Sequence, residues 1–141
     1  MQTDAEAVRA VNSRFYRALS RQNLLEMEEV WSHAAHVRCV HPGSALLRGW
    51  DTIRQSWRSM FTSAICLTVD AEDAHVSVHG PTAVVTCREW ITSFTLTGAS
   101  RTATLATNVF EKHHGRWKLI VHHASRIEGD ERDGGSASER A

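Results

Sequence analysis

The sequence lacks an excess of charge of either sign and lacks any long hydrophobic run. Sixteen Lys and Arg residues balance sixteen Asp and Glu residues, so the formal net charge of the 141-residue chain is zero. Such a chain has no overall field that favours nucleic acid or a membrane surface. No apolar run approaches the length of a membrane span, and residues 1–6 lack the pattern of a signal peptide. We therefore expect a cytoplasmic protein that binds neither nucleic acid nor a membrane.

Cysteine is scarce, and its spacing argues against the common cysteine-based sites. Cys39, Cys66 and Cys87 lie singly in apolar segments, and no Cys-x-x-Cys pair is present. An odd number of cysteines in a reducing compartment indicates buried thiols rather than disulfides or structural zinc. The dinucleotide-binding glycine motif, the Walker loop and the Gly-x-Ser-x-Gly nucleophile motif are also absent. We expect no cofactor and no metal.

The order of the periodic segments predicts an α+β fold with its helices on one face of an antiparallel sheet. Helical spacing of apolar residues indicates a first helix near 4–20, capped by Thr3, a shorter helix after Asn23 and a third after Gly49. Segments rich in Val, Thr, Ile and Trp predict strands at 37–41, 65–71, 75–78, 83–94, 102–111 and 117–125. These elements form one domain, residues 1–128, and the Gly-, Ser- and charge-rich residues 129–141 are expected to be a disordered tail.

The last two strands have a predicted register. A two-residue hairpin turn at 114–115 places His123 on the same face as Asn108 and Phe110, with His122 on the opposite face. Both faces remain largely apolar. Helices that cover one face leave the other for a second copy of the chain, so we expect a homodimer through the outer face of the sheet.

His41 and His123 are candidate catalytic residues. His41 ends an apolar segment beside the rigid Pro42-Gly43 turn, and imidazole titrates near neutral pH. The two histidines are suited to general acid–base catalysis, while the alternative is hydrogen bonding to strand ends or to a dimer partner. A metal site that includes His122 as well would require a bulge in the strand.

Glu89 is the third catalytic candidate. Strand alternation places it on one apolar face with Val85, Cys87 and Ile91. A carboxylate there must be paired or protonated, and burial would raise its pKa toward the range useful for a catalytic base. The alternative is a cross-strand ion pair with an arginine.

Five further residues are candidates for substrate binding. Asparagine is disfavoured inside a strand, so Asn108 needs a hydrogen-bond partner. That partner is either a ligand or the backbone of the His41 turn. Tyr16 offers its hydroxyl to a bound oxyanion or to water at the edge of the core. Phe110 shares the face of Asn108. Tryptophans at such spacings are mostly core residues, but one or two can line a pocket, and Trp31 and Trp57 are the candidates here.

Several segments resemble the SnoaL-like domain of the nuclear transport factor 2-like (ketosteroid isomerase-like) superfamily over about residues 4–127. They are Val30-Trp31-Ser32-His33, Val37-Arg38-Cys39-Val40-His41-Pro42-Gly43, the run from Leu47 to Trp57, Ala106-Thr107-Asn108-Val109-Phe110 and His122-His123-Ala124-Ser125. The resemblance implies a cone-shaped, curved antiparallel sheet wrapped around the N-terminal helices, as in the cystatin-like α+β roll. It also implies a pocket inside the cone and dimerisation through the outer face.

Two functional hypotheses follow, because this fold carries enzymes and binding modules alike. The first is a protein that binds a small apolar or aromatic molecule and acts as a cofactor-independent isomerase, lyase or cyclase by general acid–base proton transfer. The second is a non-catalytic dimeric ligand carrier or protein-interaction module.

Overall fold

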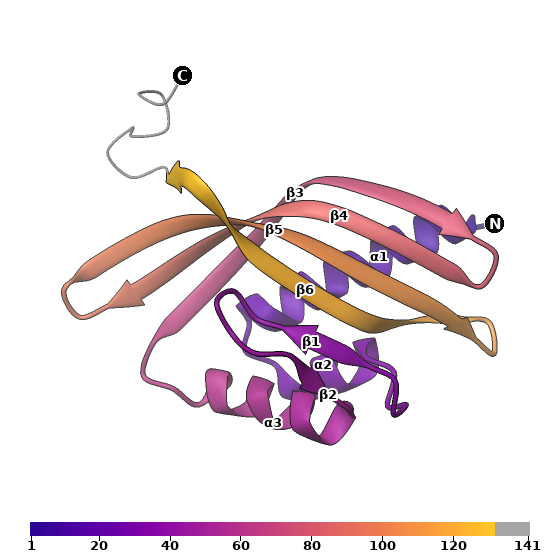
Figure 1. Cartoon of the computed structure of the whole chain (residues 1–141), viewed down its shortest axis with the longest axis horizontal. Coiled ribbons are helices and arrows are strands. Elements are labelled where there is room, and N and C mark those ends of the chain that lie inside the picture. Colours follow the sequence, from indigo (N-terminus) through magenta and orange to yellow (C-terminus); the bar gives the residue numbers. More distant parts are fainter. Residues whose placement is uncertain (132–141) are drawn as a thin grey trace.

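The computed structural model describes the backbone of residues 1–131 and the side chains of residues 1–127. It has the predicted α+β architecture, in which three helices and two short strands precede four long strands (Figure 1). The helices are α1 (Asp4–Ser20), α2 (Leu24–Val30) and α3 (Trp50–Phe61). The strands are β1 (Arg38–Val40), β2 (Leu47–Arg48), β3 (Cys66–His79), β4 (Thr82–Thr95), β5 (Gly98–His113) and β6 (Arg116–Glu131).

The helix starts are confirmed, because the sequence carries its own capping groups. Thr3 and Glu6 form the predicted capping box at the start of α1, each side chain bonding to the other residue's backbone N–H. Asn23 caps α2 by accepting the backbone N–H of Glu26 at 3.1 Å. Gly49, at φ 82°, precedes α3, whose buried face carries Trp50, Ile53 and Trp57 as the spacing predicts.

One six-stranded sheet has the order β2-β1-β6-β5-β4-β3. All neighbouring pairs are antiparallel except β1 and β6, which are parallel. The strands predicted at 65–71 and 75–78 are a single strand, β3, with an irregularity between Glu72 and His75. Strand β2 was not predicted, since two residues carry no periodic signal.

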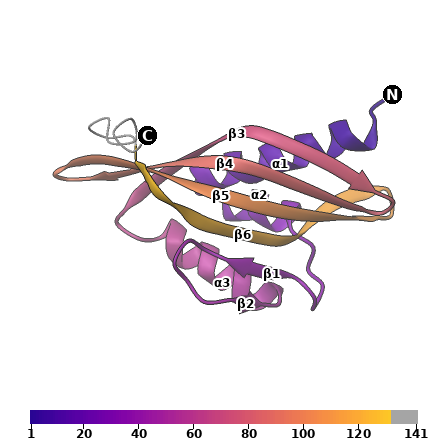
Figure 2. The ribbon, with the colours of Figure 1, turned by 45° about the horizontal axis from the view of Figure 1, so that its top comes forward.

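Among the described residues, the three helices lie on one face of the sheet and do not cover the other. Helix α1 packs mainly against β3, and α3 packs against β1 and β2 (Figures 1 and 2). The core between helices and sheet contains fully buried aromatic side chains, among them Phe15, Trp31, Trp57 and Phe110. Strand β6 continues to Glu131, so residues 129–131 of the predicted tail are extended backbone, and residues 132–141 lie outside the described part.

The predicted register of β5 and β6 is right at the turn and wrong beyond it. His114 and Gly115 form the hairpin turn with φ 50° and 79°. The register then shifts by one residue, because Ile120 is an extra residue between the pairs that β6 forms with β5. A one-residue slip exchanges the faces of a strand. His122 is therefore buried on the helix-covered face, and His123 is exposed on the outer face, the reverse of the prediction.

Within the described residues, no helix combines the length and the apolar character needed to cross a membrane.

Candidate functional site

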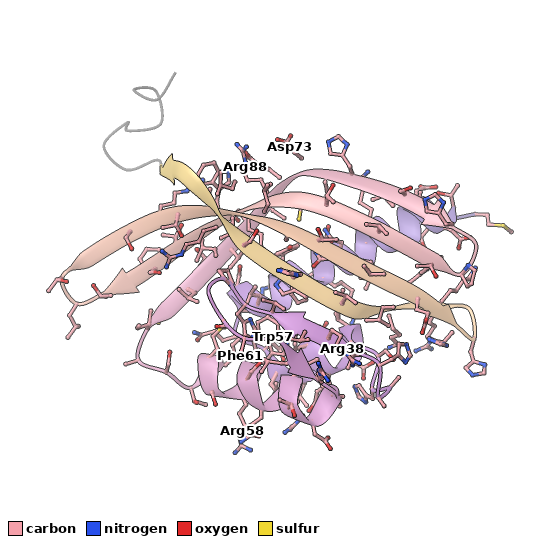
Figure 3. The ribbon with its side chains drawn as sticks, viewed as in Figure 1. Arg38, Trp57, Arg58, Phe61, Asp73 and Arg88 are labelled. Atoms are coloured by element: carbon pink, nitrogen blue, oxygen red, sulfur yellow. The ribbon has the colours of Figure 1, made fainter. Side chains whose placement is uncertain are left out.

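A small cavity of about 80 Å³ lies between the helices and the sheet. Residues of α1, α3 and strands β3, β4 and β6 line it. Its ionisable side chains are His41, Glu89 and His122, and its remaining wall is apolar. In Figure 3, Trp57 extends from α3 toward the sheet and Arg58 extends away from it. The cavity thus combines a few polar groups with an apolar wall, which is the usual composition of a small-molecule site.

Glu89 is the carboxyl group of the cavity, and the side chains described as bonded to it are two hydroxyl groups. Tyr16 donates its hydroxyl hydrogen to Oε2 of Glu89 at 2.7 Å, and Thr104 donates to Oε1 at 2.6 Å. The residue is 2% exposed. Burial raises the pKa of Glu89, and the hydrogen bonds from Thr104 and Tyr16 only partly oppose this rise. The predicted cross-strand ion pair is absent among its described contacts, so the carboxyl holds its proton to a higher pH than usual.

Asn108 fixes the direction of the hydrogen bonds around Glu89. Its amide Nδ2 donates to Oδ1 of Asn12 at 2.9 Å and to the hydroxyl of Tyr16 at 3.0 Å. Its Oδ1 therefore accepts a hydrogen from Nδ1 of His122, 2.6 Å away. A neutral His122 with its hydrogen on Nδ1 has a free lone pair on Nε2. That nitrogen lies 4.0 Å from Oε2 of Glu89.

His41 is positioned by the predicted turn. The backbone N–H of Ser44 donates to the carbonyl of His41 at 2.9 Å, and Gly43 has φ 75°. Proline and a positive-φ glycine at the two central positions are typical of a type II turn. The sequence thus places His41 at a fixed point beside the cavity.

The tautomer of His41 follows from its neighbour Ser56. The Ser56 hydroxyl donates its single hydrogen to the carbonyl of Ile53 at 2.8 Å, so it accepts from Nε2 of His41 at 3.0 Å. A neutral His41 consequently has its lone pair on Nδ1. Its ring also packs edge-on against Trp57, with centroids 4.7 Å apart.

Burial keeps both cavity histidines neutral. The pKa of His122 falls to about 3, mainly because the ring is buried and also because of charge on His123. The pKa of His41 falls to about 4, mainly through burial and also through charge on His122. At neutral pH the site therefore contains two neutral imidazoles and one carboxyl group whose pKa lies above its ordinary value.

The structure brings some of the predicted site residues together and separates others. His41, Glu89 and Trp57 line the cavity. Tyr16 and Asn108 do not line it; they form the hydrogen-bonded layer directly behind Glu89 and His122. Three predicted residues lie elsewhere: Trp31 and Phe110 are fully buried core residues that do not line the cavity, and His123 is on the outer face.

Three residues of this network were not among the predicted catalytic or substrate-binding residues. His122 was placed on the wrong face by the unrecognised bulge. Asn12 had a readable signal, because it lies one helical turn after Val8 on the buried face of α1. Thr104 also had one, since strand alternation places it on the face of Asn108.

The bulge that a histidine metal site would need is present but does not bring the three histidines together. It lies at Ile120, so His122 and His123 still point to opposite faces. Across the described side chains, no three His, Cys, Asp or Glu residues are placed to hold a metal ion.

Comparison with known proteins identifies relatives of this chain. A family model described as a SnoaL-like domain matches residues 8–128. The F-box protein SKIP8 of Arabidopsis thaliana is 29% identical over 120 residues, which are 84% of this chain and 49% of that protein. The chain thus spans about half the length of this curated relative.

Two solved structures are similar in both sequence and fold. A nuclear transport factor 2-like protein from Streptomyces avermitilis, whose name proposes a dehydratase, is 34% identical with a TM-score of 0.82, covering 88% of this chain and 96% of that one. A protein from Thiobacillus denitrificans is 33% identical with a TM-score of 0.72, covering 85% and 94% of the two chains. Its name proposes an association domain of calcium/calmodulin-dependent protein kinase type II.

Proposed function

This chain belongs to the SnoaL-like domain family of the nuclear transport factor 2-like superfamily, and we propose that it catalyses proton transfer on a small molecule held in its internal cavity. The observation that carries the proposal is the 4.0 Å separation between Oε2 of Glu89 and Nε2 of His122. Burial raises the pKa of Glu89, and Nε2 of His122 offers a lone pair, so a ligand that touches both groups from the cavity meets an acid and a base at once.

The simplest reaction for this pair is enolisation of a carbonyl compound. Glu89 donates its proton to the carbonyl oxygen while Nε2 of His122 removes a proton from the adjacent carbon. The C–H electron pair becomes the second bond of a C=C double bond, and the π pair of the C=O bond forms the new O–H bond. In an isomerisation, the protonated His122 then gives its proton to a different carbon while the enol O–H returns its proton to Glu89. In a dehydration, the protonated His122 gives its proton to a hydroxyl group on the neighbouring carbon, which leaves as water, and the enol O–H again returns its proton to Glu89. The dehydratase named among the relatives supports this class of chemistry.

Tyr16, Thr104 and Asn108 are positioning residues in this proposal. Tyr16 and Thr104 each hold one oxygen of Glu89, and Asn108 keeps the hydrogen of His122 on Nδ1. His41 supplies a second base at the edge of the cavity. No cofactor takes part in these steps.

The test is exchange of carbon-bound hydrogen for deuterium in small ketones dissolved in D₂O, followed by NMR. We expect Glu89→Gln to slow the protein-dependent exchange about 100-fold or more, because the amide cannot act as an acid. Glu111→Gln is the matched control, since Glu111 is remote from the cavity near the end of β5 and should leave exchange unchanged. Equal exchange by the E89Q variant and the wild type would contradict the proposal.

A homodimer through the outer face is a second proposal, and it is compatible with the first. Val84, Val109 and Val121 form one cross-strand row on the face that no helix covers. Leu105, on the same face, is 53% exposed. The association domain named among the relatives supports a role in assembly, with or without catalysis.

A further inference from the structure

Asn12 is a buried polar side chain of α1 at the far end of the hydrogen-bond network behind the cavity. It is 3% exposed, and its Oδ1 accepts a hydrogen from Nδ2 of Asn108 at 2.9 Å. On its oxygen side, Asn108 accepts the hydrogen of His122 Nδ1 at 2.6 Å. The three side chains therefore form one line of hydrogen bonds that runs from the first helix to the histidine of the cavity.

The amide group of Asn108 has two orientations of nearly the same shape, because its oxygen and its nitrogen are similar in size. In the reversed orientation the amide oxygen would face Oδ1 of Asn12 with no hydrogen between the two acceptors. Nδ2 of Asn108 would then donate to Nδ1 of His122. A neutral His122 would have to carry its hydrogen on Nε2, and the lone pair of Nε2 would be lost.

The hydroxyl of Tyr16 does not decide between the two orientations. It lies 3.0 Å from Nδ2 of Asn108, but a hydroxyl group rotates and donates to an amide oxygen as readily as it accepts from an amide nitrogen. The carbonyl oxygen of Asn12 has no such freedom, because it only accepts. Asn12 is therefore the partner that distinguishes the nitrogen of Asn108 from its oxygen.

The orientation of Asn12 itself is held by Cys87. The Asn12 side chain also hydrogen-bonds to Cys87, and because Oδ1 faces Asn108, Nδ2 is the group that donates to the sulfur. The thiol hydrogen goes to the Tyr16 oxygen, 3.3 Å away, since Tyr16 gives its own hydrogen to Glu89. A reversed Asn12 would press its oxygen against a sulfur whose hydrogen is already in use, so every hydrogen of the network favours the same direction.

We infer that Asn12 is a positioning residue that sets the tautomer of His122 through Asn108. A residue of the first helix thus keeps Nε2 of His122 free of hydrogen, although it does not line the cavity. This inference rests on the proposed function for the use made of that lone pair. The tautomer itself is independent of any reaction.

The test is nitrogen-15 NMR of the His122 ring at neutral pH in variants of Asn12. Asn12→Leu and Asn12→Ala both remove the acceptor, and we expect each to shift the ratio of the two tautomers at least about tenfold toward the ring with its hydrogen on Nε2. Asn12→Asp retains an acceptor in the same place and should keep the hydrogen on Nδ1. Val8→Ala is the matched control, because Val8 is fully buried one turn earlier on α1 and its truncation weakens the core without touching the network.

A hydrogen that stays on Nδ1 in both N12L and N12A to the same degree as in the wild type overturns the inference and leaves Asn12 a purely structural residue. An equal shift in V8A also overturns it, because loss of core packing would then be a sufficient cause. Deuterium exchange gives a separate readout, and we expect N12L to slow it in proportion to the rings that carry hydrogen on Nε2, with N12D restoring it. Equal exchange by E89Q and the wild type would remove the catalytic proposal, whereas a tautomer shift confined to N12L and N12A would still support the role of Asn12.

Discussion

At the scale of single residues, burial determines the chemistry of the site. Glu89 and His122 are each almost completely enclosed, and burial favours the neutral form of both groups. The two directions are opposite: the pKa of the carboxyl rises and the pKa of the imidazole falls. An acid and a base of this kind lie side by side without neutralising each other, because neither gains from ionising in an apolar space.

This arrangement predicts how stability depends on pH. The unfolded chain ionises Glu89 near its ordinary pKa of 4.5, whereas the folded protein keeps the proton to a higher pH. The stability that the protonated Glu89 provides is therefore complete below about 4.5 and is lost as pH rises through the folded pKa. Between pH 4.5 and the folded pKa, the unfolding free energy of the Glu89→Gln variant should rise relative to that of the wild type by about 1.4 kcal/mol per pH unit. Urea unfolding at several pH values measures this difference.

Glu111→Gln provides a control of opposite sign. Although burial works to raise the pKa of Glu111, hydrogen bonds from His113 and His36 hold it below its ordinary value. The E111Q variant should therefore lose stability relative to the wild type as pH rises. A difference between E89Q and the wild type that does not change with pH would show that Glu89 ionises normally in the folded protein.

At the scale of elements, the sequence predicts the parts of the site that depend on local rules. The capped helices place Tyr16 and Trp57 on buried faces, the Pro-Gly turn positions His41, and alternation along β4 turns Glu89 inward. These features follow from side chains within a few residues of each other. The buried face of Trp57 and the apolar face of Glu89 were predicted correctly, because helical and strand periods persist over many residues, whereas the burial of Tyr16 was not predicted.

The bulge at Ile120 could not be read in the same way. Leu119, Ile120 and Val121 are all apolar, so the sequence gives no sign of which of them is the extra residue. The choice depends on how β6 pairs with β5 and with β1, which are distant in the chain. For this reason the fold and half of the proposed acid–base pair were predictable, and the identity of the inward histidine was not.

Deleting Ile120 tests the role of the bulge. The pairs on either side, Phe110 with Leu119 and Val109 with Val121, can then follow each other in regular alternation, so His122 should remain buried. We expect a loss of about 2 kcal/mol in unfolding free energy from the missing buried side chain, measured by urea unfolding.

Inserting one alanine between Val121 and His122 is the matched opposite change. It should turn His122 outward and abolish deuterium exchange, whereas the deletion variant keeps it. A buried His122 in the insertion variant, or an exposed one in the deletion variant, would show that the bulge does not determine which histidine faces inward.

At the scale of the whole molecule, the uncovered face of the sheet is the feature that calls for a partner. Leu105→Glu would place a charge in the proposed dimer interface beside Arg88, its cross-strand neighbour, and we expect it to raise the dimer dissociation constant at least about 100-fold, since burying a charge in an apolar interface is costly. Light scattering after gel filtration measures the change. Leu25→Glu is the control, because Leu25 is 75% exposed on α2, away from the sheet, and should leave the mass unchanged.

A wild-type protein that is monomeric at micromolar concentration would remove the dimer proposal.

Nitrogen-15 NMR of the His122 ring, followed across a pH titration, tests the acid–base pair most directly. We predict that the ring carries its hydrogen on Nδ1, leaves Nε2 unprotonated and stays neutral from neutral pH down to about 3. A ring that gains a proton near pH 6.5, or that carries its hydrogen on Nε2, would contradict the assignment of His122 as the base that faces Glu89.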